Sequence, residues 1–385
     1  MIYLDNSATT PLLPEVREAM QPYLSDRFGN ASSIYSLGRD AKMALEDARG
    51  HIAQAIGADP SEIVFTSGGT EANNYAIKGA IFELLRTGKL LTDLSIITSQ
   101  VEHHAILEPC AFFESLGVKM TKASVDELGR VSETNILLNN DTASLASFML
   151  VNNEVGSINR IQNISATLKA NNSDTIVHTD AIQALGKLDI HVHDLGVDLL
   201  SLSAHKVHGP KGIGALYIRR GLKIEPLVHG GAQERNRRGG TEAVALAVGF
   251  GEAVRMMLAT KNDVQQKLQD LRSYAIEKLS AIPEIIFNSP TDDRGVASIV
   301  NISFKPELLP RLDSDALLIH FDLEDIAVSN GSACTSGSLQ PSHVLLAMGK
   351  GDEVAAKSLR ISFSRFSEEA DIDAFVIALK KLIVN

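Results

Sequence analysis

The sequence has little cysteine, no tryptophan and no long apolar run. Only two cysteines, Cys110 and Cys334, occur in 385 residues, which excludes a disulfide framework and favours a reducing, cytoplasmic location. No apolar run approaches the roughly 20 residues of a membrane-spanning helix, and the start Met1–Asp5 lacks the pattern of a secretion signal. Positive charge is not in excess: the net charge of −11 argues against direct nucleic-acid binding.

What remains is the composition of a globular protein, with 44% hydrophobic and 22% charged residues. The length exceeds one ordinary core and predicts two domains. Strand-like and helix-like segments alternate from Ile63 to Ile218, which predicts an α/β fold with a mostly parallel sheet covered on both faces. A helical stretch from Glu242 to Leu279 then leads to a smaller α+β region. Its strands are expected near 299–304, 326–329 and 359–363, and its last helix near 370–384.

Lys206 stands where a strand ends and a loop bounded by glycine and proline begins. A lone lysine is most often solvated, but here Ser203 and His205 precede it and Gly209 follows. A lysine with a lowered pKa can hold an aldehyde as a Schiff base, and pyridoxal phosphate is such an aldehyde.

Two further segments would serve such a cofactor. Ser67–Thr70 joins a strand to a helix, where free N–H groups and the helix dipole can hold a phosphate; an ordinary capped turn is the simpler interpretation. Asp180 ends an apolar strand, with Gln183 just beyond it. A buried aspartate needs a partner, and a protonated pyridine nitrogen is suitable.

Other polar residues also fall at strand ends or in loops. His103 at a strand-to-helix junction could stack on a ring and move protons, and Asn153 follows a buried strand. The basic loop 235–242 could contact a phosphate. Arg360 lies in a strand and would suit a carboxylate, although an internal ion pair is a common alternative.

The two cysteines have different surroundings. Cys110 lies on the apolar part of a helix and is expected to fill the core. Cys334 lies in the Gly/Ser-rich run 329–338, which predicts a mobile loop with a reactive thiol.

These motifs together resemble those of cysteine desulfurases, in order along essentially the whole chain. The matching segments are 4–11, 66–71, 102–103, 152–154, 178–181, 203–206 and 332–336. The loop around Cys334 resembles the NifS/IscS-like group I branch of this family, which belongs to the class-V aminotransferases. Gly69 stands where the family often has alanine.

The resemblance implies a homodimer of fold type I that uses pyridoxal 5′-phosphate to convert L-cysteine to L-alanine and an enzyme persulfide. It implies that Lys206, Cys334 and His103 are catalytic and that Asn153 and Arg360 bind the substrate. It also implies these cofactor-binding residues: Gly69, Thr70, His103, Asn153, Asp180, Gln183, Ser203, His205, Lys206 and, from the other subunit, Thr241.

The sulfur acceptor implied is a protein, either an iron–sulfur scaffold or an enzyme of tRNA or cofactor thiolation. We expect residues 15–255 to form the large domain, and residues 1–14 with 256–385 the small one. Neither a membrane nor a bound metal is expected.

Three alternatives remain at this point. An aminotransferase or selenocysteine lyase would share the fold, although Cys334 argues against the aminotransferase. A metal hydrolase would depend on His191, His193, His205 and His208, but Leu195 occupies the position of its second acid. A non-catalytic sulfur-relay protein would not need the full set of catalytic groups.

Overall fold

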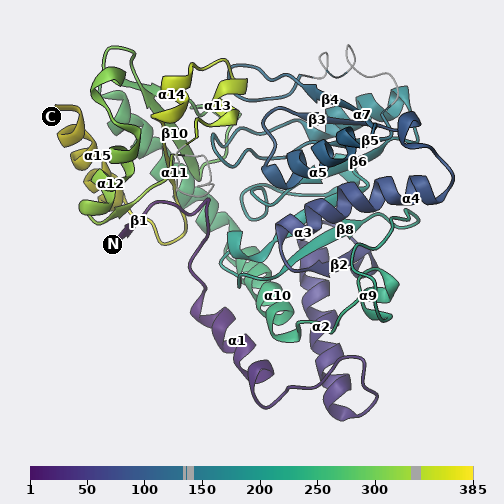
Figure 1. Cartoon of the computed structure of the whole chain (residues 1–385). Helices are drawn as coiled ribbons and strands as arrows, with labels where there is room; N and C mark the ends of the chain where they lie inside the picture. The colour runs from purple at the N-terminus through teal and green to yellow at the C-terminus, as the bar shows by residue number, and fades with distance from the viewer. Residues whose placement is uncertain (133–135, 137–142, 331–339, 385) are drawn as a thin grey trace.

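The centre of the protein is a seven-stranded sheet. The computed structural model describes residues 1–132, 136, 143–330 and 340–384. From one edge to the other the strands are β2 (Ile63–Thr66), β8 (Gly214–Ile218), β7 (Leu199–Ser203), β6 (Ile176–Asp180), β5 (Leu145–Ser147), β3 (Ser95–Ser99) and β4 (Lys119–Ala123). Only the pairs that β8 makes with β2 and β7 are antiparallel. The predicted mostly parallel α/β sheet is confirmed (Figure 1).

Helices cover both faces of this sheet because successive side chains of each strand point to opposite sides. In β8, Ala215 and Tyr217 join one apolar cluster, whereas Leu216 and Ile218 join the other. The first cluster also contains residues of α2 (Ser36–Ala55), α7 (Ile161–Asn171) and α10 (Val244–Ala259). The second contains residues of α3 (Gly69–Asn74), α4 (Ala80–Arg86) and α5 (His104–Ser115).

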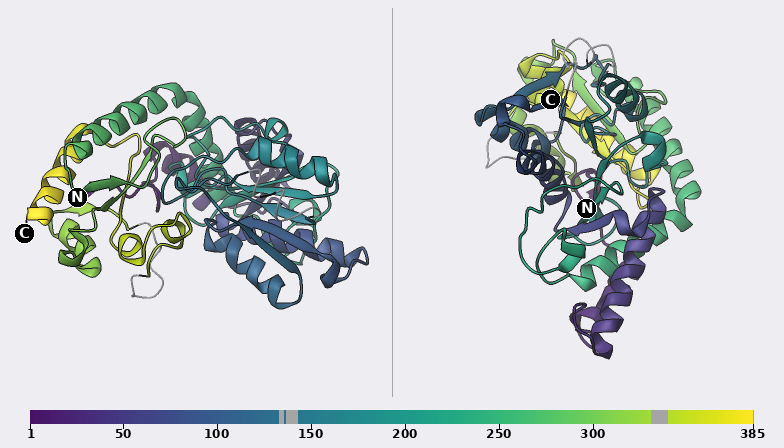
Figure 2. Two further views of the ribbon diagram at one scale, coloured as in Figure 1. Left: turned by 90° about the horizontal axis from the view of Figure 1, so that it is seen from above. Right: turned by 90° about the vertical axis from the view of Figure 1, so that its right-hand side faces the viewer.

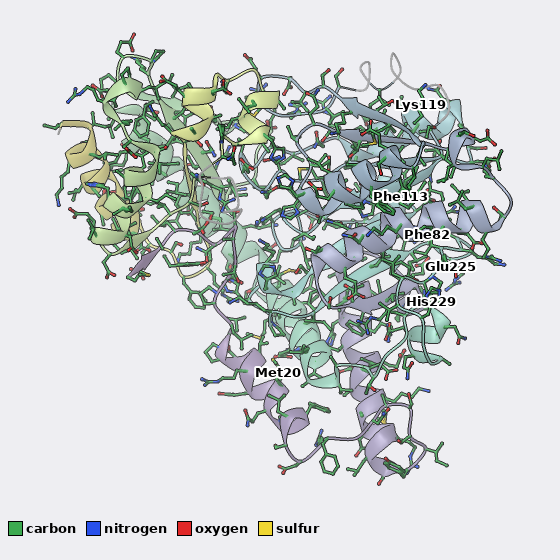
Figure 3. The ribbon with its side chains drawn as sticks, in the orientation of Figure 1. Met20, Phe82, Phe113, Lys119, Glu225 and His229 are labelled. Carbon is green, nitrogen blue, oxygen red and sulfur yellow. The ribbon has the colours of Figure 1, made fainter. Side chains whose placement is uncertain are left out.

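One continuous helical segment, α3 to α4, passes through the π-helical turn Tyr75–Gly79. Its Phe82 packs edge-to-face on Phe113 of α5, with ring centroids 5.4 Å apart (Figure 3). Cys110, one turn earlier in α5, is fully buried in the same cluster. The prediction that Cys110 fills the core is therefore confirmed.

The second sheet has three strands, all antiparallel. They are β12 (Leu359–Ser362), β10 (Ile299–Phe304) and β9 (Ile285–Phe287). It packs with α11 (Lys261–Ser280), α12 (Ser314–Leu323) and α15 (Glu369–Val384) around a separate apolar cluster. β1 (Ile2–Tyr3) pairs in parallel with β11 (Ile326–Ala327), which places the N-terminus in this part of the molecule. The C-terminus lies there too, because α15 is the last helix (Figure 1).

The shorter helices connect these layers or extend from them. They are α1 (Pro14–Leu24), α8 (Val192–Leu195), α9 (Gln233–Asn236), α13 (His343–Ala347) and α14 (Asp352–Ala356). The region of α1 and α2 projects from the body of the molecule (Figure 2). Within the described residues, none of the helices has the length and apolar character needed to cross a membrane.

The structure differs from the sequence prediction at several element ends. The buried strand expected just before Asn153 already ends at Ser147, and the helical stretch from Glu242 to Leu279 is divided into α10 and α11. Strands β4 and β9 were not predicted. The expected domain boundary after residue 255 falls inside α10, and the domain division stays a prediction.

A buried ion pair fixes α2 to β2 and to α9. Arg49 donates to both carboxylate oxygens of Glu234 at 2.7 and 2.8 Å and to the carbonyl of Ile63 at 2.8 Å. The same carboxylate accepts the backbone N–H of Phe65 at 2.9 Å. Since both charged side chains are 3% exposed, removing one leaves the other charged and buried.

We expect Arg49→Met to lower the free energy of unfolding by about 3–5 kcal/mol, because the Glu234 carboxylate loses its cation. Arg255→Met is the matched control: Arg255 is 50% exposed in its pair with Glu252, and such pairs contribute about 1 kcal/mol or less. Urea unfolding measures both. Equal losses for the two variants would contradict this account of the ion pair.

Candidate active site

The site lies at the edge of the large sheet where its parallel strands end. Asp180 is the last residue of β6, Ser203 is the last of β7, and Gly69 begins α3 just after β2. Such strand ends are where α/β proteins bind ligands. The volume of the pocket, counted with the space open to solvent, is about 1230 Å³, which leaves room for a cofactor and an amino acid. Ten of the predicted site residues line it: Gly69, Thr70, His103, Asn153, Asp180, Gln183, Ser203, His205, Lys206 and Arg360.

Lys206 ends the short 3-10 turn that follows β7. Its Nζ donates hydrogen bonds to the backbone carbonyls of Ser7, at 2.5 Å, and Ala8, at 2.8 Å. Burial and the nearby guanidinium of Arg360 lower the pKa of Lys206 to about 8, because both disfavour the ammonium form. The side chain therefore supplies a neutral amine much nearer to neutral pH than an exposed lysine does.

Asp180 is a buried carboxylate held by two neutral donors. Asn73 Nδ2 donates to one oxygen at 2.7 Å, and the backbone N–H of Ile182 donates to the other at 2.9 Å. Burial raises the pKa of Asp180. A cationic N–H bound beside it would reverse that shift, which is the property that a protonated pyridine nitrogen has.

His103 is the N-cap of α5, and its Nδ1 accepts the backbone N–H of Ala105 at 3.0 Å. Burial lowers the pKa of His103, so the neutral ring is favoured. Since Nδ1 is an acceptor, the neutral ring carries its proton on Nε2. The ring thus has a fixed orientation and one exchangeable proton on its other nitrogen.

A cradle for an anion is formed by the start of α3 and the end of β7. Gly68 adopts φ +154°, and a Cβ on Gly69 would lie 2.2 Å from Ile182 Cδ1. Thr70 and Ser203 bring hydroxyl groups to this end of the pocket. Burial lowers the pKa of His205 to about 4, and its Nδ1 lies 3.1 Å from Thr9 Oγ1. The donors are those of a phosphate site: helix N–H groups and hydroxyls.

Arg360 approaches from β12 on the other side of the pocket. Its Nη2 donates to Asp5 Oδ1 at 2.7 Å and its Nη1 to the carbonyl of Asn153 at 2.9 Å. Its Nε is buried and has no hydrogen-bond partner among the described residues. Both roles predicted for Arg360 are therefore compatible. The ion pair with Asp5 leaves other N–H groups of the guanidinium for a substrate carboxylate.

Gln183 is held at both ends of its amide. Nε2 donates to the carbonyl of Ser7 at 2.9 Å, and Oε1 accepts from Lys187 Nζ at 2.5 Å. One N–H of the amide remains for a ligand oxygen.

The two remaining predicted residues are Thr241 and Cys334. Thr241 lines a neighbouring pocket together with Thr66 and Arg238, and its predicted action in the other subunit stays a prediction. Cys334 lies outside the described residues. Burial raises the pKa of the other thiol, Cys110, to about 12, which makes it a poor nucleophile at neutral pH.

The four histidines of the metal-hydrolase alternative do not form one metal site. His191 and His193 are exposed at α8, whereas His205 lines the pocket and His208 lies 2.9 Å from the carbonyl of Pro11. Across the described part of the chain, no group of three or more His, Cys, Asp or Glu side chains is arranged to hold a metal ion.

The sequence did not identify three supports of the site. Asn73 holds Asp180, Asp5 pairs with Arg360, and the Ser7 carbonyl accepts from Lys206 and Gln183. Asn73 lies one helical turn after Gly69, so helical spacing could have indicated it. Asp5 and Ser7 lie in the N-terminal segment 4–11, but their partners are about 180 to 355 residues away.

The residues fit pyridoxal phosphate. The anion cradle, the buried Asp180 and the amine of Lys206 line one pocket with the incompletely bonded Arg360. These groups match the phosphate, ring nitrogen and aldehyde of the cofactor and the carboxylate of an amino-acid substrate.

Comparison with known proteins identifies a family that uses this cofactor. Residues 2–375 match the aminotransferase class-V family. The chain is 46% identical over 385 residues to a protein of Dictyoglomus turgidum named cysteine desulfurase IscS, covering 99% of this chain and 94% of that one. It is 45% identical to the protein of the same name from Methanosarcina thermophila, over 99% and 92% of the two chains.

Solved structures agree in fold. A NifS-like protein superposes with a TM-score of 0.89 at 33% identity, covering 100% of this chain and 98% of the other. A structure described as SspA in complex with cysteine superposes with a TM-score of 0.81 at 35% identity, over 96% and 100%.

The lowered pKa of Lys206 predicts how fast cofactor-free protein recaptures pyridoxal phosphate. The neutral amine reacts, so the rate should rise about tenfold per pH unit below pH 8 and level off above it. Arg360→Met should move the midpoint upward, because one charge that lowers the pKa of Lys206 is removed. Stopped-flow absorbance measures both. A wild-type midpoint near the ordinary lysine value of about 10.4, or no movement in the variant, would refute the assignment.

Proposed function

The chain belongs to the aminotransferase class-V family and is a pyridoxal-phosphate-dependent cysteine desulfurase, and we propose that the pocket around Lys206 is its active site. The observation that carries this proposal is the convergence of ten predicted residues from separate segments on one pocket. Pyridoxal phosphate, when bound, supplies an electron sink for the charge that develops at Cα of the amino acid.

We propose that Arg360 and Asn153 bind the carboxylate of L-cysteine. Nε of Arg360 has no partner among the described residues, and Nη1 and Nη2 each keep one N–H beyond the contacts with Asn153 and Asp5. A charge-assisted hydrogen bond to a carboxylate fixes the amino acid by one end. Asp180 orients the cofactor at the opposite wall, and the cradle of Gly69, Thr70, Ser203 and His205 holds its phosphate.

Lys206 and His103 are positioned to move protons. Lys206 takes the proton from Cα, since its lowered pKa makes the amine available as a base. His103 carries a proton on Nε2 while Nδ1 is held by Ala105, so it acts as the acid at the substrate side. Both groups line the pocket with Asp180 and Arg360.

Cys334 then receives the sulfur. Its thiolate attacks the sulfur of the substrate, an S–S bond forms, the Cβ–S bond breaks, and the electron pair returns to carbon, which is protonated to give L-alanine. The substrate sulfur remains on the enzyme as a persulfide, and no outside oxidant is needed. We propose that an iron–sulfur scaffold or a tRNA or cofactor thiolation enzyme accepts it in the cytoplasm. Affinity capture with persulfide-labelled protein identifies the acceptor.

We propose that residues 15–255 form the cofactor-binding domain and that residues 1–14 and 256–385 form the smaller one. The apolar clusters support this division: Leu4 packs in the cluster of α11 and α15, whereas Val254 packs in the cluster of the large sheet.

A homodimer is proposed from the projecting region of α1 and α2 (Figure 2). Phe28, Ile34, Tyr35 and Met43 are 74%, 89%, 57% and 71% exposed there. An exposed group of large apolar side chains is typical of a protein interface. A second subunit covering it would also allow the basic loop with Thr241 to reach the neighbouring cofactor.

We expect Ile34→Asp together with Met43→Asp to weaken the dimer by at least about tenfold, because two charges replace apolar contacts. Leu323→Asp is the control, since Leu323 is 82% exposed on α12 in the other part of the molecule. Analytical ultracentrifugation measures the dissociation constant. A monomeric wild type that is fully active at the same concentration would exclude the dimer proposal.

The two cysteines should separate in one assay. Cys334→Ala should bind the cofactor and L-cysteine but form neither persulfide nor alanine, because no thiolate takes the sulfur. Cys110→Ala should retain desulfuration and lose about 1 kcal/mol of stability, because Cys110 is buried in α5. Alanine release and persulfide labelling measure both. Wild-type turnover by Cys334→Ala, or loss of activity on removing Cys110 alone, would mean that the wrong thiol is assigned.

A further inference from the structure

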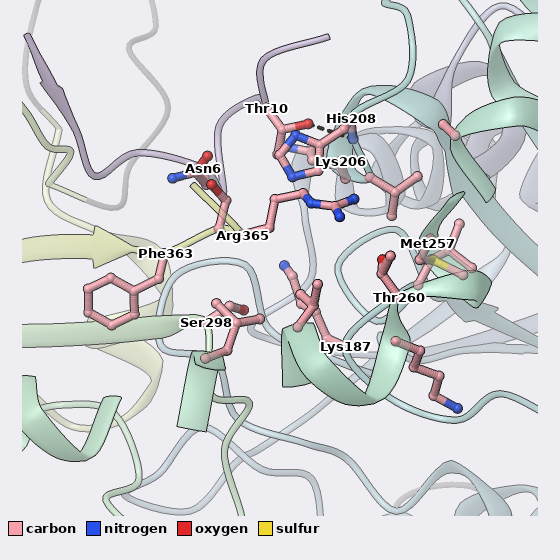
Figure 4. A pocket seen from close by; sticks show the side chains of 18 of the residues that line it. Asn6, Thr10, Lys187, Lys206, His208, Met257, Thr260, Ser298, Phe363 and Arg365 are labelled. Atoms are coloured by element: carbon pink, nitrogen blue, oxygen red, sulfur yellow. Dashed lines mark hydrogen bonds between the residues drawn. The ribbon is translucent and has the colours of Figure 1, made fainter. Parts of the chain in front are cut away.

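A second cavity lies behind the active-site pocket. It lies between the N-terminal segment, the end of α10, the start of α11 and residues 363–365, and its volume, counted with the space open to solvent, is about 640 Å³ (Figure 4). Ser7 and Lys206 line both cavities. The carbonyl of Ser7, bonded to Lys206 and Gln183, lies in the wall between them.

The charge on this cavity is entirely positive. Among the described residues its lining includes Lys187, Lys206, Lys261 and Arg365 but no aspartate or glutamate. Lys261 is neutralised by an ion pair with Asp189, and Lys206 is bonded to two carbonyls. Lys187 and Arg365 are the cations of the lining for which the described structure supplies no counter-ion.

Lys187 has only a neutral partner, Gln183 Oε1. Burial and the charges of Lys206 and Arg360 lower the pKa of Lys187 to about 7, as expected for an ammonium group without an anion. The described residues give the guanidinium of Arg365 neither a hydrogen bond nor an ion pair; its backbone carbonyl accepts from Lys267. Figure 4 shows the two side chains at the same cavity.

The other lining groups indicate the kind of anion. Ser298 is 1% exposed, and its hydroxyl has no partner in the described structure. The side-chain oxygen of Asn6, 5% exposed, is also unbonded there. The remaining wall is largely apolar: Leu185, Met257, Val264, Leu268 and Phe363. An unbonded polar group nine-tenths buried is costly unless a ligand or water completes it.

We propose that this cavity binds a small organic carboxylate with an aliphatic body. The guanidinium of Arg365 and the ammonium of Lys187 provide charged donors for the carboxylate. The Ser298 hydroxyl adds a neutral donor, and the apolar wall takes the aliphatic part. The cavity shares Ser7 and Lys206 with the active-site pocket, but the binding proposed here requires only Lys187, Arg365, Ser298 and the apolar wall.

Isobutyrate is a suitable probe, measured by saturation-transfer NMR on the holoenzyme. Because Arg360 is also expected to bind carboxylates, the measurement uses Arg360→Met as the background. Adding Lys187→Met or Arg365→Met should weaken isobutyrate binding about tenfold or more, the usual effect of losing one charge-assisted hydrogen bond. Adding Lys261→Met should leave binding within about twofold, because Asp189 already neutralises Lys261.

Three results would overturn the proposal. They are unchanged binding in both the Lys187 and Arg365 variants, an equal loss in the Lys261 variant, or inorganic phosphate binding as tightly as isobutyrate. Lys187→Arg keeps the cation and should retain binding, which separates loss of charge from loss of fold. Thermal melting of each variant checks that it remains folded.

Discussion

The site depends on a short N-terminal segment that joins two distant parts of the chain. The carbonyls of Ser7 and Ala8 hold Lys206, and Ser7 also accepts from Gln183. Asp5, two residues earlier, pairs with Arg360. Without this segment the amine would have no acceptors and the guanidinium no anion. Because both groups are substantially buried, the position of residues 5–8 sets the position of both ends of the pocket.

The electrostatics of the pocket follow from the same arrangement. Burial raises the pKa of Asp180 and lowers that of Lys206, and Arg360 lowers the latter further. The shift at Asp180 disfavours the charged form that a bound cofactor would stabilise, whereas the shift at Lys206 favours the neutral amine that reacts with the cofactor. A site built this way gains favourable contacts when its ligands bind, which is how perturbed groups come to gather at functional sites. The cavity behind Lys206 has the same imbalance, since Lys187 and Arg365 lack an anion among the described residues.

Much of the fold could be predicted from local sequence pattern. Strand β10 was expected at its observed bounds because its β-branched and aromatic residues are those typical of strands. Strand β4 was missed because Lys119 and Lys122 are exposed at a sheet edge, where side chains need not be apolar. The strand-end residues of the site were found because their chemistry is visible in sequence. Asp5 and Asn73 were not, because their function depends on partners 355 and 107 residues away.

The central claim is that Lys206 both holds the cofactor and moves the proton of the substrate. The most direct measurement is L-alanine release from L-cysteine by Lys206→Ala protein supplied with pyridoxal phosphate, with borohydride reduction used to detect covalent attachment of the cofactor. The account predicts that no cofactor is reduced onto this position and that turnover falls by at least about 10²-fold, the usual contribution of a general base. Turnover at the wild-type rate would contradict the assignment of the whole site.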